Sequence, residues 1–294
     1  MATLDPTPLE VRDRAVAWMN RGHELLLRGD DVSLDRALDA YHEAIVLLRR
    51  LPLAENPGWA NSLGAALMNR GRLLHRLHGV AQAALTLAAF DEAAVLLRGL
   101  QAADNPWPRR NLAGTLVNRA NLLLDLAQFA EAAAGAREAA ALSAPHERAE
   151  PVDADLALKA RRALGDALGH LLVAPGADQE ALARQASDVV DEALDLIRHW
   201  TNRREISFRT LALRFFRYGA QLYRFHQPHF LAEFIEEHLP AGDAEFAALA
   251  RETIDAALRD GPGTGRFLTV GDPASERRRQ AWHELAALRG RLVT

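Results

Sequence analysis

The chain has 294 residues, of which 49% are hydrophobic, 25% charged and 6% aromatic, and its formal net charge is −4. This composition is typical of a folded chain, and the charge is too small to indicate electrostatic capture of nucleic acid or of a membrane surface. Because the chain has no cysteine, disulfides, thiol catalysis and Cys-ligated metal sites are excluded.

The N-terminal sequence MATLDPTPLEVRDRA contains acidic residues and lacks the apolar core of a signal peptide. The sequence also has no stretch of about 18 uncharged apolar residues, the length that a membrane-spanning helix needs. We therefore expect a cytoplasmic protein that has no membrane or nucleic-acid partner.

A short string recurs at a fixed interval in the first half of the chain. MNRGHEL at 19–25 returns as MNRGRLL at 68–74 and as VNRANLL at 117–123, 49 residues apart each time. Self-similarity at a fixed period predicts a repeat architecture, in which each unit buries its apolar face against its neighbours.

The first unit, about 15–53, has the pattern of a helix, a short turn and a second helix. Apolar residues recur at helical spacing over 15–28, GDDV at 29–32 breaks the pattern, and Ser33 is the predicted cap of the next helix. The second helix carries one apolar stripe, formed by Ala37, Leu38, Tyr41, Ala44, Ile45 and Leu48.

Two further units follow at about 58–102 and 107–143. ENP at 55–57 and DNP at 104–106 separate the units, because the residue before proline avoids the α region and proline suits a first helical turn. Trp59 and Trp107 come directly after these prolines. We expect both rings to seal the joints between neighbouring helix pairs.

The repeat pattern weakens beyond residue 145. Divergent helix pairs are predicted at 154–200 and 209–240, followed by capping helices within 243–292. A last helix with a charged face is what a stack of repeats needs to close its open end. We predict a single all-α solenoid of antiparallel helix pairs over 1–294, without a separate domain.

The three units resemble tetratricopeptide (TPR) repeats. That family has W-x2-L-G-x2-Y on the first helix of each pair, then A-x3-F and a second Ala on the second helix. The first unit has Trp18, Gly22, Leu25, Ala37, Tyr41 and Ala44; the second has Leu67, Gly71, Leu74, Thr86, Phe90 and Ala93; the third has Leu116, Ala120, Leu123, Ala132, Ala136 and Ala139. The resemblance implies a right-handed superhelix, in which the small residues let the two helices of a pair approach closely and the larger ones fill the gaps between them.

Two features depart from the family pattern. The period of 49 residues exceeds the family's period of about 34. Arg21, Arg70 and Arg119 stand where the family has leucine. These arginines form either a ladder for an acidic partner or ion pairs with Glu and Asp of adjacent helices, and we favour the second interpretation because exposed ion pairs are common.

The resemblance also implies a binding surface on the concave side, where first helices of the family hold extended peptides. Asn20, Asn69 and Asn118 occupy one position of three successive first helices, and in the family an Asn there often contacts the peptide backbone. The rest of the candidate peptide-binding site comprises Met19, His23, Met68, Arg72, His75 and Asn121. The alternative is a structural row whose carboxamides bond the next helix.

The motifs that would indicate an enzyme, a cofactor or a metal site are incomplete or absent, so we expect none of the three. GPGTG at 261–265 lacks the GK[ST] ending of a phosphate loop. A proline separates His226 from His229, which breaks the helical spacing of a zinc-binding pair. Motifs such as GxSxG and HExxH are absent.

The predicted function is that of a non-catalytic scaffold or adaptor that holds a protein or peptide partner in its concave groove. Two alternatives are a regulatory sensor, whose superhelix pitch changes on ligand binding, and an enzyme with a site assembled across repeats. The segment 208–230 concentrates Phe, Tyr and Arg, which are enriched at interfaces. It is therefore a candidate homodimer interface.

Overall fold

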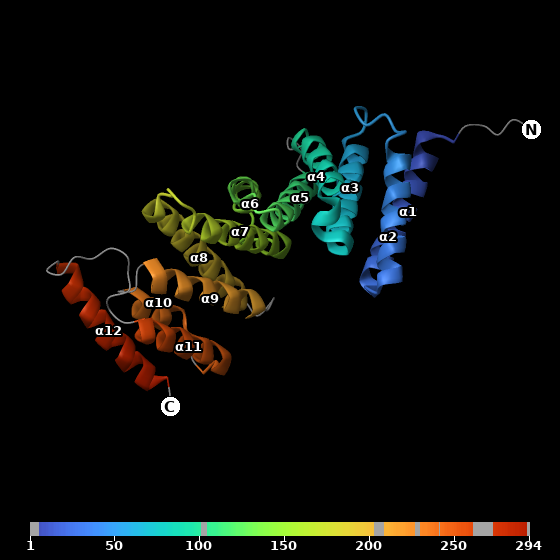
Figure 1. The fold of residues 1–294 in the computed structure, drawn as a ribbon. Helices are drawn as coiled ribbons and strands as arrows, with labels where there is room; N and C mark the ends of the chain where they lie inside the picture. Colours follow the sequence, from blue (N-terminus) through green and yellow to red (C-terminus); the bar gives the residue numbers. More distant parts are fainter. Residues whose placement is uncertain are drawn as a thin grey trace, which may run out of the picture. The chain divides into compact units, whose positions relative to one another are not determined.

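A computed structural model describes residues 6–100, 105–202, 209–226, 230–240, 242–260 and 273–292. These residues form twelve α-helices and one short 3-10 helix, with no strand among them (Figure 1). Consecutive helices pack together as an all-α solenoid, which confirms the predicted fold class. The chain divides into two compact units, 1–167 and 168–294, and the single superhelix over the whole chain stays a prediction.

Three helix pairs make up most of the first unit. The helices are α1 (Pro8–Arg28), α2 (Asp31–Leu48), α3 (Pro57–His78), the 3-10 helix η1 (Gly79–Gln82), α4 (Ala83–Arg98), α5 (Pro106–Asp125) and α6 (Phe129–Ser143), followed by the start of α7 (Pro151–Leu172). Each pair packs on the next through α2 with α3 and α4 with α5. First helices also meet directly, because α3 contacts α5.

The second unit contains the end of α7 and five more helices. These are α8 (Gln179–Asn202), α9 (Arg209–His226), α10 (Leu231–His238), α11 (Ala244–Asp260) and α12 (Pro273–Arg291). Phe215 and Phe216 of α9 are fully buried, and the Phe216 ring lies 5.7 Å from that of Phe234. These two phenylalanines of the predicted dimer segment therefore belong to the unit's own core. Residues 261–265 and 227–229 lie outside the described residues.

Side chains at the helix starts explain where the repeats divide. Asn56 and Asn105 accept hydrogen bonds from the backbone N–H groups of Gly58 and Trp107, and proline is the first residue of α3 and of α5. Each Asn-Pro therefore caps a new helix as well as ending the previous unit. For α2, the prediction of Ser33 as cap is wrong, because Asp30 accepts the N–H of Ser33 and the helix begins at Asp31.

The two helices of a pair come close where a small residue faces a ring. A methyl group added at Gly71 would lie 2.6 Å from Cε1 of Phe90, and one added at Gly22 would lie 3.0 Å from the Tyr41 ring. The same device recurs in the second unit, where Gly219 lies against Phe234. Only glycine lets these helix backbones approach with the ring between them.

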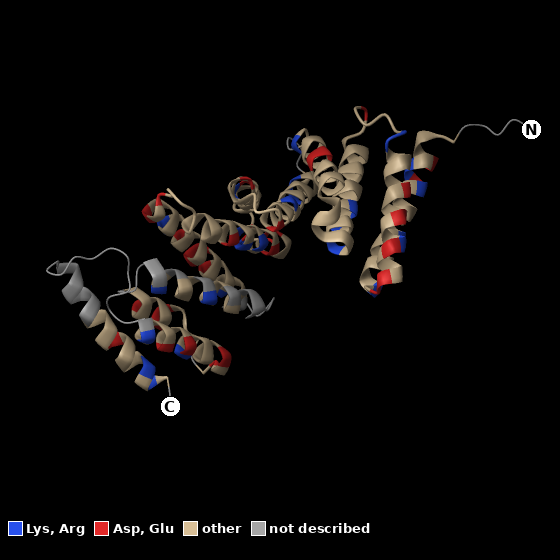
Figure 2. Ribbon diagram, in the orientation of Figure 1, with Lys and Arg blue, Asp and Glu red and all other residues tan. Residues whose placement is uncertain are grey.

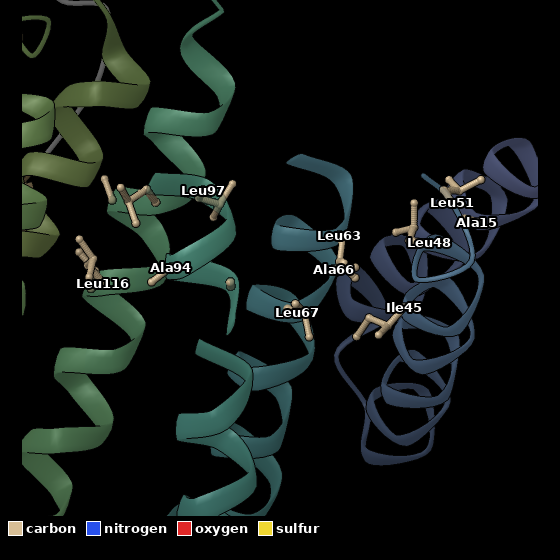
Figure 3. Close-up of a cluster of buried hydrophobic side chains, with 14 of the residues drawn as sticks. Ala15, Ile45, Leu48, Leu51, Leu63, Ala66, Leu67, Ala94, Leu97 and Leu116 are labelled. Carbon is tan, nitrogen blue, oxygen red and sulfur yellow. The ribbon is translucent and has the colours of Figure 1, made fainter. Parts of the chain in front are cut away.

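Leucine and alanine fill the joints between successive pairs. Figure 3 shows Ile45 and Leu48 of α2 beside Leu63 and Leu67 of α3, and a similar layer formed by Leu97 and Leu116. Pro57–Arg98 is the one described run long and apolar enough to cross a membrane by length and composition. It comprises α3 and α4, whose leucines contribute to this core.

The two tryptophans after the prolines behave differently. Trp59 is half-buried and packs against the core cluster, as predicted. Trp107 is 55% exposed, and the guanidinium of Arg110 lies over its ring at 5.8 Å. The prediction that Trp107 seals a joint is therefore wrong.

Substitution of Gly71 by alanine tests the close approach of α3 and α4. We expect Gly71→Ala to lower the free energy of unfolding by about 1–3 kcal/mol, because the new methyl group forces the Phe90 ring out of its place. The control is Gly165→Ala in α7, where a methyl group meets nothing within 4 Å. Alanine favours a helix there by about 0.5–1 kcal/mol. Equal effects in urea unfolding would contradict this packing.

Candidate peptide-binding surface

Two facing rows of side chains line the contact between α3 and α5. Residues seven apart lie on one face of a helix, so the rows are Asn61, Met68 and His75 on α3, and Asn111, Asn118 and Asp125 on α5. Nδ2 of Asn111 donates to Oδ1 of Asn61 at 3.0 Å. At the other end, Nε2 of His75 lies 2.7 Å from Oδ2 of Asp125. The middle position, with Met68 and Asn118, lies between these two polar contacts.

The predicted Asn row is accessible. Asn20 is exposed, and Asn69 and Asn118 are half-buried. Within the described part of the chain, none of these three carboxamides forms a hydrogen bond with another protein group. The structural alternative, in which the row bonds the next helix, is therefore not observed among these residues.

Two other predicted site residues are engaged within the protein. His75 contacts Asp125, as described above. Oδ1 of Asn121 accepts a hydrogen bond from Nη2 of Arg162 at 2.6 Å, and the same guanidinium donates to Asp166. These contacts tie α3 to α5 and α5 to α7.

The remaining predicted residues surround the row. Met19 is half-buried against the core, and Met68 lies beside Gly114, where an added methyl group would be 3.2 Å from its sulfur. His23 and Arg72 are exposed. Burial raises the pKa of the Tyr41 phenol, and the positive charge of Arg72 opposes this rise. The surface thus combines apolar, carboxamide and cationic groups.

The sequence analysis missed four residues of this surface: Asn61, Asn111, Asp125 and Arg162. The Asn61 and Asn111 pair is separated by 50 residues, whereas the repeat interval is 49. The two asparagines are therefore not equivalent in the repeat. A search at heptad spacing from Asn118 would have found Asn111 and Asp125, because such residues share a helix face.

The three arginines at this repeat position, Arg21, Arg70 and Arg119, differ in their ion pairs. Nε of Arg119 donates to Oδ1 of Asp91 at 2.7 Å, and its Nη2 lies 3.8 Å from Glu131. Arg21 is 3.9 Å from Glu24 of its own helix. Pairing with adjacent helices is confirmed for Arg119. Among the described residues it is not found for Arg70, whose Nε is buried without a hydrogen-bond partner there.

A buried carboxylate holds α7 against α5. Asp153 has a fully buried side chain, and it accepts two hydrogen bonds from Arg109 and two from Arg110 at 2.8–3.2 Å. Arg109 also donates to the carbonyl oxygen of Leu142 at the end of α6. The charged residues of this contact lie among those coloured on α5 and α7 in Figure 2. Asp153 thus fixes the helix that follows the third repeat.

The arginines determine the ionisation of Asp153. Burial by itself would raise the pKa of this carboxyl, but hydrogen bonds from Arg109 and then Arg110, with their positive charges, outweigh it. The pKa therefore lies below its ordinary value of 3.8. Asp153 is an anionic structural anchor across the neutral pH range.

Comparison with known proteins shows a likeness of fold alone. No family model matches the sequence, and no curated protein matches it. The crystal structure of BtubC (BKLC) from P. vanneervenii is similar over 88% of this chain and 89% of that chain, with a TM-score of 0.50 and 16% sequence identity. The designed helical repeat protein DHR64 aligns over 97% of each chain at 17% identity, with a TM-score of only 0.21.

Substitution of Asp153 tests the anchor. We expect Asp153→Asn to lower the free energy of unfolding by about 2–3 kcal/mol, because the half-buried guanidinium groups of Arg109 and Arg110 lose the buried carboxylate that they share. The control is Asp155→Asn, which removes a partly exposed pair with Lys159 on the same helix and costs about 0–1 kcal/mol. Similar urea midpoints for both variants would contradict a buried anchor.

The pH dependence of stability provides a second measurement. Because the pKa of Asp153 is lower in the folded than in the unfolded chain, its stabilisation is complete above the ordinary value of 3.8 and is lost as pH falls through the lower folded value. The wild type should therefore lose more stability than Asp153→Asn as the pH falls below about 4. Parallel pH profiles would contradict this assignment.

Proposed function

We propose that the protein is a non-catalytic, TPR-like scaffold that binds an extended segment of a partner protein along α1, α3 and α5. The observation that carries the proposal is the lack of hydrogen-bond partners for the Asn row among the described residues. Three equivalent carboxamides have no protein partner among the described residues, whereas His75 and Asn121 close beside them are satisfied. A repeated polar group without an internal role supports an external one.

The chemistry of the row suits a peptide backbone. Each carboxamide donates and accepts hydrogen bonds, so it can pair with both groups of a peptide unit. Packed helices lie about 8–10 Å apart, and an extended chain advances about 3.3 Å per residue. Asn69 and Asn118 would therefore contact peptide units about three residues apart.

The surroundings of the row add the other requirements of a binding surface. Met19 and Met68 offer flexible, polarizable apolar contact. His23 and Arg72 supply exposed polar and positive groups beside it. The helices α3 and α5, which carry Asn69 and Asn118, are fixed by the Asn61–Asn111, His75–Asp125 and Asp153 contacts, and a preformed surface lowers the ordering cost of association.

The packing of glycine against an aromatic ring within helix pairs supports the TPR-like assignment. Gly22 against Tyr41 and Gly71 against Phe90 show the small-to-large contact that the resemblance implies. The scaffold interpretation assigns no chemical step to this surface. It needs only hydrogen bonding and apolar contact.

Stability measurements separate a binding row from a packing row. We expect Asn69→Ala/Asn118→Ala to leave the free energy of unfolding unchanged or to raise it by up to about 1 kcal/mol, because no hydrogen bond is lost and alanine favours a helix. The matched control Asn111→Ala removes the bond to Asn61 and should cost about 1 kcal/mol. A clear loss of stability in the double variant would show that the row packs.

Binding is tested with displayed random 12-residue peptides selected on the wild type. Fluorescence anisotropy then gives the Kd of each enriched peptide. We expect Asn69→Ala/Asn118→Ala to weaken binding about 10- to 100-fold, since two hydrogen bonds are removed. N-methylation of the contacted peptide amides should cause a similar loss. Unchanged Kd values for every peptide would overturn the proposal.

A further inference from the structure

The third repeat contains an ion pair whose counterpart in the second repeat is incomplete. Arg119 on α5 lies between Asp91 of α4, at 2.7 Å, and Glu131 of α6, at 3.8 Å. Arg119 is held by the second helix of the preceding pair and by that of its own pair. This geometry shows how a carboxylate binds at this position of the repeat.

Repeat register identifies the equivalent residues one unit earlier. Arg70 precedes Arg119 by one period, and FDEAAVLL at 90–97 aligns with YHEAIVLL at 41–48, so His42 replaces Asp91. The second helix of the third repeat aligns with that of the second repeat through Thr86 with Ala132, as in the repeat pattern above. The residue before each is Leu85 in the second repeat and Glu131 in the third, so Leu85 replaces Glu131. Both carboxylates of the third repeat are therefore missing from the second.

Arg70 keeps the positive charge of this repeat position but has neither of the two carboxylates that Arg119 has. Its Nε is buried and has no hydrogen-bond partner. Among the described residues, its guanidinium forms neither a hydrogen bond nor an ion pair. The Nη atoms of Arg70 are not buried, so a carboxylate can reach the guanidinium there. A cation without a counter-charge gains from such a charge-assisted bond.

Two apolar side chains that follow α3 are exposed. Leu85, which stands in the place of Glu131, is 56% exposed, and Val80 on η1 is 50% exposed. Both residues lie where α3 turns into α4. This edge differs from the Asn row, because Arg70 and Asn69 are neighbours on a helix and point about 100° apart.

We propose that this edge of α3, η1 and α4 is a second docking surface. Its occupant is a segment of a partner protein that places an Asp or Glu side chain on Arg70, and apolar side chains on Val80 and Leu85. The partner's carboxylate takes the position that Asp91 takes beside Arg119. The proposal does not depend on the Asn row and can fail independently of it.

The first test places a carboxylate beside Arg70 by substitution within the chain. His42→Asp restores the missing carboxylate, and we expect it to raise the midpoint of thermal unfolding by about 1–4 °C. The control His42→Asn should not raise it, and His42→Asp should have no such effect in an Arg70→Gln background. An absent rise, or the same rise without Arg70, would overturn the proposal.

Binding is tested with displayed random 12-residue peptides. The informative peptides bind the wild type and Asn69→Ala/Asn118→Ala equally, but lose about 10-fold or more in affinity on His42→Asp and on Arg70→Gln. We expect each to contain Asp or Glu between apolar residues, and its amide analogue to lose affinity to the same degree.

Two outcomes of the selection contradict the proposal. In one, no peptide distinguishes the Arg70 and His42 variants from the wild type. In the other, the sensitive peptides lack an acidic residue. Stabilisation by inorganic phosphate without any such peptide would indicate a simple anion site, and it would overturn the assignment of a protein partner.

Discussion

The close contact between the two helices of each pair is the constraint on which this structure depends. A single amphipathic helix pair cannot bury its apolar face alone, so pairs must stack, and stacking requires pairs of uniform thickness. Gly22 and Gly71 provide this thickness by admitting the rings of Tyr41 and Phe90. The third repeat reaches the same end with two alanines, Ala120 and Ala136, both fully buried.

Stacking turns one helix face into a continuous surface. Once α3 and α5 lie side by side, residues at heptad spacing on each helix face one another. Asn61 with Asn111 and His75 with Asp125 satisfy their polar groups across this contact, whereas Asn118, opposite Met68, has no hydrogen-bond partner among the described residues. Among the described residues, the packing that stabilises the solenoid thus leaves the carboxamides of Asn20, Asn69 and Asn118 unpaired at one position of three successive repeats.

Because the repeats are similar, equivalent residues of two repeats can be compared within one molecule. Arg119 and Arg70 have the same place in the repeat, but only Arg119 has carboxylates beside it. The contrast identifies Arg70 as a donor without a partner among the described residues. Asp153, in contrast to Arg70, is fully buried and is hydrogen-bonded to both Arg109 and Arg110, so its role is structural.

The sequence by itself determined the helix pairs, their Asn-Pro boundaries, the small-to-large contacts and the position of the Asn row, because each follows from local propensity or from the repeat interval. Tertiary structure decided the rest. The Asn61–Asn111 and Asn121–Arg162 bonds join residues outside the repeat register, and Trp107 became exposed where Trp59 was covered. These outcomes depend on which side chains adjacent helices bring together, and that is fixed by packing rather than by periodicity.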